Sequence, residues 1–284
     1  MPSPGEIVAY CSLAALQGVL VALPRPSGSA IWSRLRSPGW ALLLPGALMV
    51  GTFGVLAVPH GATGLAALAE VATPVLVGPA VLGVVRGPRQ AWLAAVPLLG
   101  ASALALHSWP AALAASLLTA LGCLTLGAAL VRLTPLPWLV AGIAAMCIVD
   151  VALLATGVGQ PAAAQLETAL RHSGLPEFHR AQIGSMNRDY PDLVLAAVLG
   201  TALAGHARQR TAALLVAILA SANGLFFLVA DMLPATVPLG VAAVAVVALE
   251  RRRGRTRGPT AQRRRAPAVR GPAGPRVAAE PMKA

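Results

Sequence analysis

Apolar residues along this chain come in long blocks, and short stretches that hold most of the charged residues separate the blocks. Each block has about 17–25 residues, which is the length that a helix needs to cross the hydrocarbon core of a bilayer. A segment inside a bilayer must satisfy its own backbone hydrogen bonds, so we read the blocks as helices. The pattern predicts an all-α polytopic membrane protein with nine transmembrane helices, at residues 6–23, 40–58, 63–85, 90–108, 111–131, 136–158, 191–207, 211–230 and 234–250.

Composition points to the same class of protein. Hydrophobic residues make up 57% of the 284 residues, and charged residues make up 11%. A soluble domain usually carries about a quarter charged residues, because its helices need a polar face toward water. Residues 1–250 are therefore expected to form one transmembrane domain.

The basic residues predict the orientation of this domain. They follow the first, third, fifth, seventh and ninth spans, whereas the connections after the second and fourth spans carry no Lys or Arg. Cytoplasmic loops are enriched in Lys and Arg, so the N-terminus is expected outside and the C-terminus in the cytoplasm of a cell-membrane protein. The basic residues that set this alternation before the tail are Arg25, Arg34, Arg36, Arg86, Arg89, Arg132, Arg208 and Arg210.

The segment 251–284 is a basic tail rich in Pro, Gly and Arg, and it holds eleven of the 22 Lys and Arg residues. Such a composition cannot bury a core, so we expect a disordered cytoplasmic tail. The tail is suited to anionic lipid headgroups. The positive-inside rule already accounts for its charge, so we predict no nucleic-acid partner. The cysteines and histidines lack metal-ligand spacing, and no metal or cofactor is expected.

The connection at residues 159–190 is expected outside the membrane. At about 30 residues it is long for a link between two helices, and long connections are often functional. Its AAAQLETALRH stretch is consistent with a short surface helix.

Apart from Glu6 and Glu250 at the outermost positions of the first and last spans, three of the ten acidic residues fall within predicted spans: Glu70, Asp150 and Asp192. A carboxylate at the centre of a span costs about 2.5–3.5 kcal/mol on insertion scales, so such residues usually mark function or a specific pairing. Asp150 lies about eight residues from the outer end of the sixth span, or roughly 12 Å below the surface at the rise of a helix. Asp192 opens the seventh span, so both acids are expected in the outer half of the bilayer.

Two neighbouring carboxyls can act together as an acid and a base. One stays protonated while the other is ionised, and the pair can then activate water against an amide carbonyl without a metal. Taken alone, Asp192 also fits a simple role at the start of a helix, where Pro191 precedes it. The ninth span begins with Pro234 and Pro238, an irregular start that either lines a cavity or is a plain turn into a helix.

In these features the chain resembles the presenilin and signal peptide peptidase family of intramembrane aspartyl proteases. That family has nine spans, with one catalytic Asp in a Tyr-Asp pair of the sixth span and another in Gly-x-Gly-Asp of the seventh, and Pro-Ala-Leu opens the ninth. Here the corresponding stretches are Val149-Asp150, Asp189-Tyr190-Pro191-Asp192 and Pro234-Ala235-Thr236. The resemblance implies that Asp150 and Asp192 are catalytic. It also implies that Pro234, Ala235 and Thr236 hold an extended transmembrane substrate beside them.

Two alternatives remain open from the residues. Glu70, with Pro74 four residues later, could serve with Asp150 in a transporter or channel-like protein. The glycines that the family has before its second aspartate are missing before Asp192. The chain could therefore also be a catalytically degenerate member that acts as a membrane scaffold.

Overall fold

The computed structural model describes residues 3–26, 30–84, 95–104, 108–173, 178, 180–184, 186–225 and 236–245. All of them belong to one compact unit that ends at Val246. The predicted disordered tail, at residues 251–284, lies outside the described residues.

The described chain is mostly helical, as the sequence predicts. Its α-helices are α1 (Pro4–Ala22), α2 (Leu43–Ala57), α3 (Gly61–Pro79), α4 (Ala95–Leu104), α5 (Trp109–Leu133), α6 (Leu136–Ala155), α7 (Gly159–Ser173), α8 (Tyr190–Ala202) and α9 (Gln209–Leu225). Residues 237–245 form a further helical segment. Three short helices complete the set: η1 (Ala30–Leu35), η2 (Pro38–Leu42) and η3 (Ala80–Val84).

Five helical stretches in the described residues are long and apolar enough to cross a membrane: Pro4–Ala22, Pro38–Ala57, Gly61–Val84, Trp109–Leu133 and Leu136–Ala155. The prediction of a helical protein with membrane-spanning segments is confirmed to this extent. The helix α8 is apolar but shorter. The count of nine spans and the orientation stay predictions.

Local sequence explains where several helices begin. Ser3 caps α1, and its side chain and that of Glu6 form a capping box that satisfies two free backbone N–H groups. Ser108 caps α5, and its hydroxyl accepts a hydrogen bond from the backbone N–H of Ala111. Pro191 stands in the first turn of α8, where its missing N–H costs nothing.

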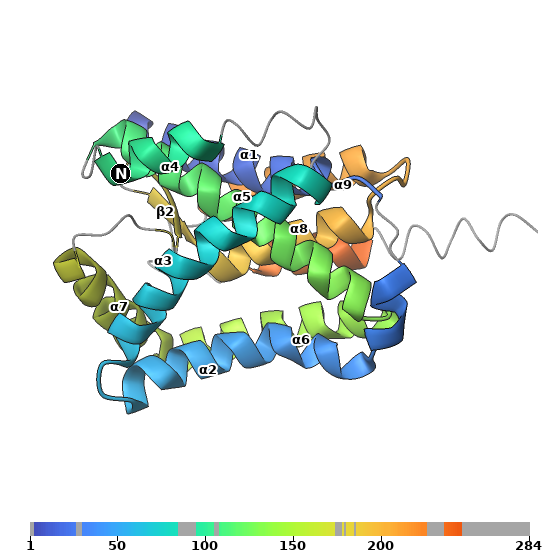
Figure 1. Ribbon diagram of the computed structural model, residues 1–284, viewed down its shortest axis with the longest axis horizontal. Coiled ribbons are helices and arrows are strands. Elements are labelled where there is room, and N and C mark those ends of the chain that lie inside the picture. The colour runs from blue at the N-terminus through green and yellow to red at the C-terminus, as the bar shows by residue number, and fades with distance from the viewer. Residues whose placement is uncertain are drawn as a thin grey trace, which may run out of the picture. The chain divides into compact units, whose positions relative to one another are not determined.

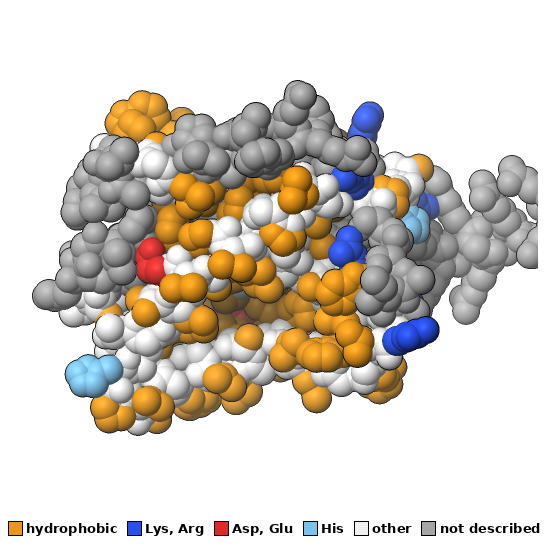
Figure 2. Space-filling view, in the orientation of Figure 1, with side chains coloured by type: hydrophobic (Ala, Val, Ile, Leu, Met, Phe, Trp, Pro, Cys, Tyr) orange, Lys and Arg blue, Asp and Glu red, His pale blue; other side chains and the backbone are white. Residues whose placement is uncertain are grey.

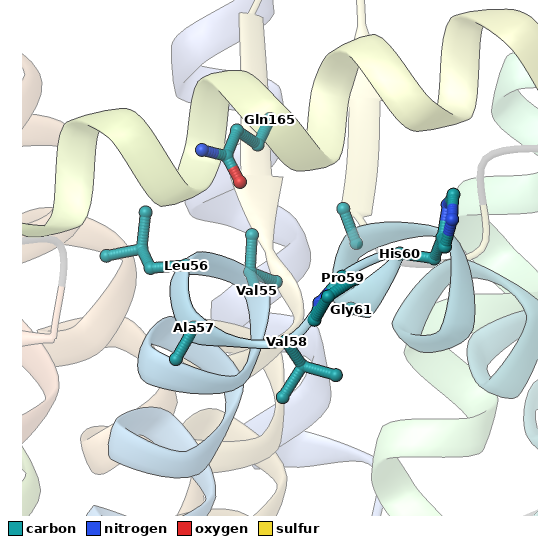
Figure 3. Close-up of a pocket in the computed structure, with 9 residues that line it drawn as sticks. Val55, Leu56, Ala57, Val58, Pro59, His60, Gly61 and Gln165 are labelled. Carbon is teal, nitrogen blue, oxygen red and sulfur yellow. The ribbon is translucent and has the colours of Figure 1, made fainter.

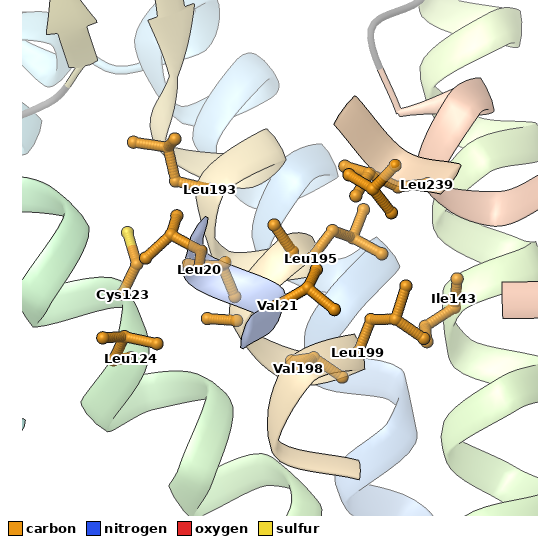
Figure 4. Close-up of a cluster of buried hydrophobic side chains, with 14 of the residues drawn as sticks. Leu20, Val21, Cys123, Leu124, Ile143, Leu193, Leu195, Val198, Leu199 and Leu239 are labelled. Carbon is orange, nitrogen blue, oxygen red and sulfur yellow. The ribbon is translucent and has the colours of Figure 1, made fainter. Parts of the chain in front are cut away.

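Helix α8 lies in the centre of the unit. Every residue from Asp192 to Gly200 is buried, although Asp192 is a carboxylic acid. Figure 4 shows the cluster that surrounds it, with side chains from α1, α5, α6 and the 237–245 segment around those of α8. An acid on this helix is therefore enclosed by protein.

Two glycines let other helices come close to α8. A Cβ atom at Gly127 of α5 would lie 2.7 Å from the backbone of Ala197 and Val198. A Cβ atom at Gly200 of α8 would lie 2.6 Å from the backbone of Leu20 and Val21 in α1. Small residues at such crossings allow backbones to approach closely, as is common between membrane helices.

Helices α2 and α6 run side by side as a pair (Figure 1). The pair meets the rest of the unit partly through the 237–245 segment, where Gly240 packs against Cys147 of α6. In Figure 1 the row of α3, α5 and α8 lies beside this pair.

The long connection contains a helix and a hairpin. The helix predicted there is present as α7, which lies against α2 and α3. The hairpin of β1 (Arg180–Ile183) and β2 (Met186–Asp189) is antiparallel, with Arg180 opposite Asp189. Gly184 takes a left-handed backbone conformation in its turn, with φ of +61°. The sequence pattern does not predict this hairpin.

Candidate active site

Asp150 lies in α6, and its carboxyl is partly exposed. The hydroxyl Oγ1 of Thr236 donates a hydrogen bond of 2.7 Å to Asp150 Oδ2. These residues are 86 positions apart in the chain. The contact joins the predicted sixth span to the predicted start of the ninth.

Thr236 is buried, with 1% of its surface exposed, and it immediately precedes the 237–245 segment. Its carbonyl accepts a backbone hydrogen bond from the N–H of Gly240 and a hydrogen bond from the Cys147 thiol, at 3.0 and 3.5 Å. Thr236 is therefore fixed between this helical turn and α6. Pro234 and Ala235, the other predicted substrate-binding residues, lie outside the described residues.

Asp192 lies in the first turn of α8, directly after strand β2, and is 6% exposed. Its carboxyl is within electrostatic range of Asp150, Asp189 and the Arg188 guanidinium. The Cys147 thiol is within range of both Asp150 and Asp192. In the part of the chain that the structure describes, the two carboxyls are near each other but are not hydrogen-bonded to one another.

Arg188 is a feature of the site that sequence reasoning missed. It lies in β2 and is buried, with 5% of its surface exposed. Its terminal nitrogen donates a hydrogen bond to the Tyr10 hydroxyl of α1, and its guanidinium lies over the Tyr10 ring, 4.4 Å from the ring centroid. A buried cation near the buried Asp192 carboxyl offsets part of the cost of enclosing its charge. The sequence offered only one signal, a basic residue four positions before Asp192.

A hollow opens between the row that contains α3 and the α2–α6 pair. Figure 2 shows that its walls are mostly hydrophobic and that an acidic side chain lies at its bottom. An apolar entrance with an acid inside suits a substrate that arrives from the lipid phase rather than from water.

Glu70, the acid of the transporter alternative, lies in α3 and is half-buried. Its Oε1 is buried and has no hydrogen-bond partner among the described residues. No interaction between Glu70 and Asp150 is seen in the described chain, so the structure does not bring this pair together as it does Asp150 and Thr236.

An open pocket elsewhere carries no acid. It is lined by the α2–α3 turn, from Val55 to Ala62, and by Gln165 of α7 (Figure 3). Its lining has no carboxyl or thiol, so it offers no acid pair for hydrolysis. We therefore place the candidate site at Asp150, Asp192 and Thr236.

No protein-family model matches this chain, and neither a search of curated proteins nor a search of solved structures finds a match.

Proposed function

We propose that this protein is an intramembrane aspartyl protease that hydrolyses peptide bonds within transmembrane segments of other proteins. The observation that carries the proposal is the hydrogen bond from Thr236 to Asp150, beside the buried Asp192. It supports the proposal because Thr236, from the third stretch that carries the resemblance, contacts Asp150 from the first, and the Asp150 charge acts on Asp192 from the second.

The chemistry needs one ionised and one protonated carboxyl. The ionised carboxylate takes a proton from a water molecule, whose oxygen bonds to the scissile carbonyl carbon. The other carboxyl gives its proton to the carbonyl oxygen, which yields a tetrahedral diol. The C–N bond then breaks as the amide nitrogen takes a proton from one carboxyl and a diol hydroxyl gives a proton to the other. An acid and an amine are released, and the pair again holds one proton. Asp150 and Asp192 are the two carboxyls, and no metal or cofactor takes part.

The proposed substrate is a helix that must unwind, because a peptide carbonyl inside a helix is blocked by its own hydrogen bond. An extended segment then needs partners for its freed backbone groups. Strand β2 belongs to a two-stranded sheet and leads directly into Asp192. Edge strands pair readily with extended peptides, so β2, together with Pro234, Ala235 and Thr236, suits this role.

We also propose a presenilin-like arrangement of nine spans in a cell membrane, with the N-terminus outside and the C-terminus inside. The alternation of basic connections along the sequence supports it. In this orientation the basic tail meets the anionic headgroups of the cytoplasmic leaflet.

The test is cleavage of a helical transmembrane reporter by the purified full-length protein in lipid vesicles. Asp150→Asn and Asp192→Asn should each abolish cleavage. Glu167→Gln, which changes an acid of α7 outside the pair, should leave it intact. If both Asp variants still cleave at the wild-type rate, the assignment is wrong.

The second candidate function is a proton- or ion-coupled transporter. It is favoured by the buried oxygen of Glu70, which has no hydrogen-bond partner among the described residues. In vesicles, a transporter would show coupled uptake that is lost in Glu70→Gln, with no reporter cleavage. A scaffold would bind its partners equally well in Asp150→Asn and Asp192→Asn.

A further inference from the structure

We propose that Thr236 is a positioning residue for hydrolysis and that it acts through its hydroxyl. By holding Asp150 Oδ2 it turns Oδ1 of the same carboxyl toward the attacking water. The inference rests on the proposed function and assigns to Thr236 a task beyond contact with the substrate.

The hydroxyl of Thr236 is used in an unusual way for its place in the chain. A Thr just before a helix commonly accepts a hydrogen bond from a backbone N–H of the first turn. Here its Oγ1 donates instead to Asp150 Oδ2, at 2.7 Å. The residue is buried, and its carbonyl is engaged by Gly240 and Cys147. A β-branched side chain has few χ1 rotamers, so this donor is held in place.

The hydrogen bond makes the two oxygens of Asp150 different. Oδ2 accepts a hydrogen bond from the Thr236 hydroxyl. This bond favours the unprotonated form of Oδ2, so we expect the proton that the acid pair shares to lie on Asp150 Oδ1 or on Asp192. Asp150 is partly exposed whereas Asp192 is buried, so water reaches the pair from the Asp150 side, and Oδ1 is the Asp150 oxygen that does not hold the Thr236 contact. Fixing one oxygen therefore orients the other, and orientation of a reacting group is a large part of catalysis.

Thr236 also differs from the residue that the Pro-Ala-Leu motif has at this position. Pro-Ala-Leu ends in a leucine, which has no donor, and this chain has Thr236 there. The hydroxyl contact is thus a property of this chain that the motif does not supply.

The experiment compares four variants of the full-length protein in vesicles, with the helical transmembrane reporter as the probe. Thr236→Val keeps the shape and removes the donor, and Thr236→Ser keeps the donor. Thr236→Ala differs from Thr236→Ser by the hydroxyl alone. Thr156→Val is the control, because Thr156 also lies at α6 but bonds only to carbonyls of its own helix.

Loss of a hydrogen bond to a charged group should lower kcat by about ten- to a hundredfold in Thr236→Val. KM should stay within about twofold, because the substrate contacts remain. Thr236→Ser should recover most of kcat, and Thr156→Val should match the wild type. If Thr236→Val unfolds in the vesicles, the Ser and Ala pair gives the same comparison.

Two results would overturn the inference. One is a wild-type kcat in Thr236→Val, or in Thr236→Ala where the Val variant does not fold. The other is an equal loss in the Ser variant and in the variants without a hydroxyl, which would mean that shape rather than the donor matters. Asp150→Asn separates these outcomes from failure of the proposed function. If Asp150→Asn is inactive and Thr236→Val is active, only the positioning role is wrong. If Asp150→Asn is active, the proposed protease function is wrong.

Discussion

Gly127 should control both the stability of the helix core and the position of Asp192. It lies where α5 crosses α8, and an added Cβ would come within 2.7 Å of the backbone of Ala197 and Val198. Carbon atoms in contact prefer separations of about 3.5–4.0 Å, so Gly127→Ala must part the two helices by about 1 Å. The nearest of these atoms are backbone atoms, so the clash cannot be relieved by a change of side-chain rotamer.

The size of the effect follows from a comparison with Gly64 in α3, where an added Cβ meets nothing within 4 Å. Both changes replace a helical glycine by alanine, so both gain similar helix propensity, up to about 1 kcal/mol. Overpacking typically costs about 1–3 kcal/mol, and only Gly127→Ala incurs it. The free energies of unfolding of the two variants should therefore differ by about 1–3 kcal/mol, with Gly127→Ala the less stable.

The catalytic effect should be larger than the effect on stability. A displacement of about 1 Å at a reacting group can lower a rate by about a hundredfold. Asp192 is carried on α8, so Gly127→Ala should cleave the reporter far more slowly than Gly64→Ala. Unfolding in mixed detergent gives the stability, and initial cleavage rates give the activity. Equal unfolding free energies and equal rates in both variants would refute the helix packing on which this reasoning rests.

Three further outcomes are expected. Arg188→Met removes the buried cation that donates to the Tyr10 hydroxyl and acts on Asp192, so it should slow reporter cleavage, whereas Tyr10→Phe keeps the cation and should slow cleavage less. Equal cleavage rates in the two variants would show that the charge does not act on the site. Ser116 exchanges hydrogen bonds with both backbone groups of Gln182, so Ser116→Ala should loosen the hairpin by about 1 kcal/mol, seen as faster amide exchange at 180–189 with unchanged exchange in α9. A reporter enzyme that works only in the cytoplasm should be active when it is fused to the C-terminus, and an inactive fusion would contradict the proposed orientation.

Much of the fold could be predicted because the forces that set it are local. The parts of the apolar blocks that the structure describes are mostly helical, and caps such as Ser3 and Ser108 act through residues next to them in the sequence. The hairpin was missed because its strands have only four residues each and no alternation long enough to recognise. A two-stranded hairpin is marginal by itself, so packing must stabilise it. Here the hydrogen bonds between Ser116 of α5 and Gln182 of β1 supply part of that stabilisation.

The candidate site could likewise be predicted only in part. The sequence by itself determined which acids would be costly in a membrane, and so pointed to Asp150, Asp192 and Glu70. Only the tertiary structure decided how these acids are partnered. It brings the Thr236 hydroxyl to Asp150, buries Arg188 on Tyr10 near Asp192, and leaves Glu70 without a partner for its buried oxygen among the described residues. The physical reason is that the cost of burying a charge depends on residue type and depth, which the sequence records. The interactions that offset this cost come from residues up to 178 positions apart in the sequence, which only tertiary packing brings together.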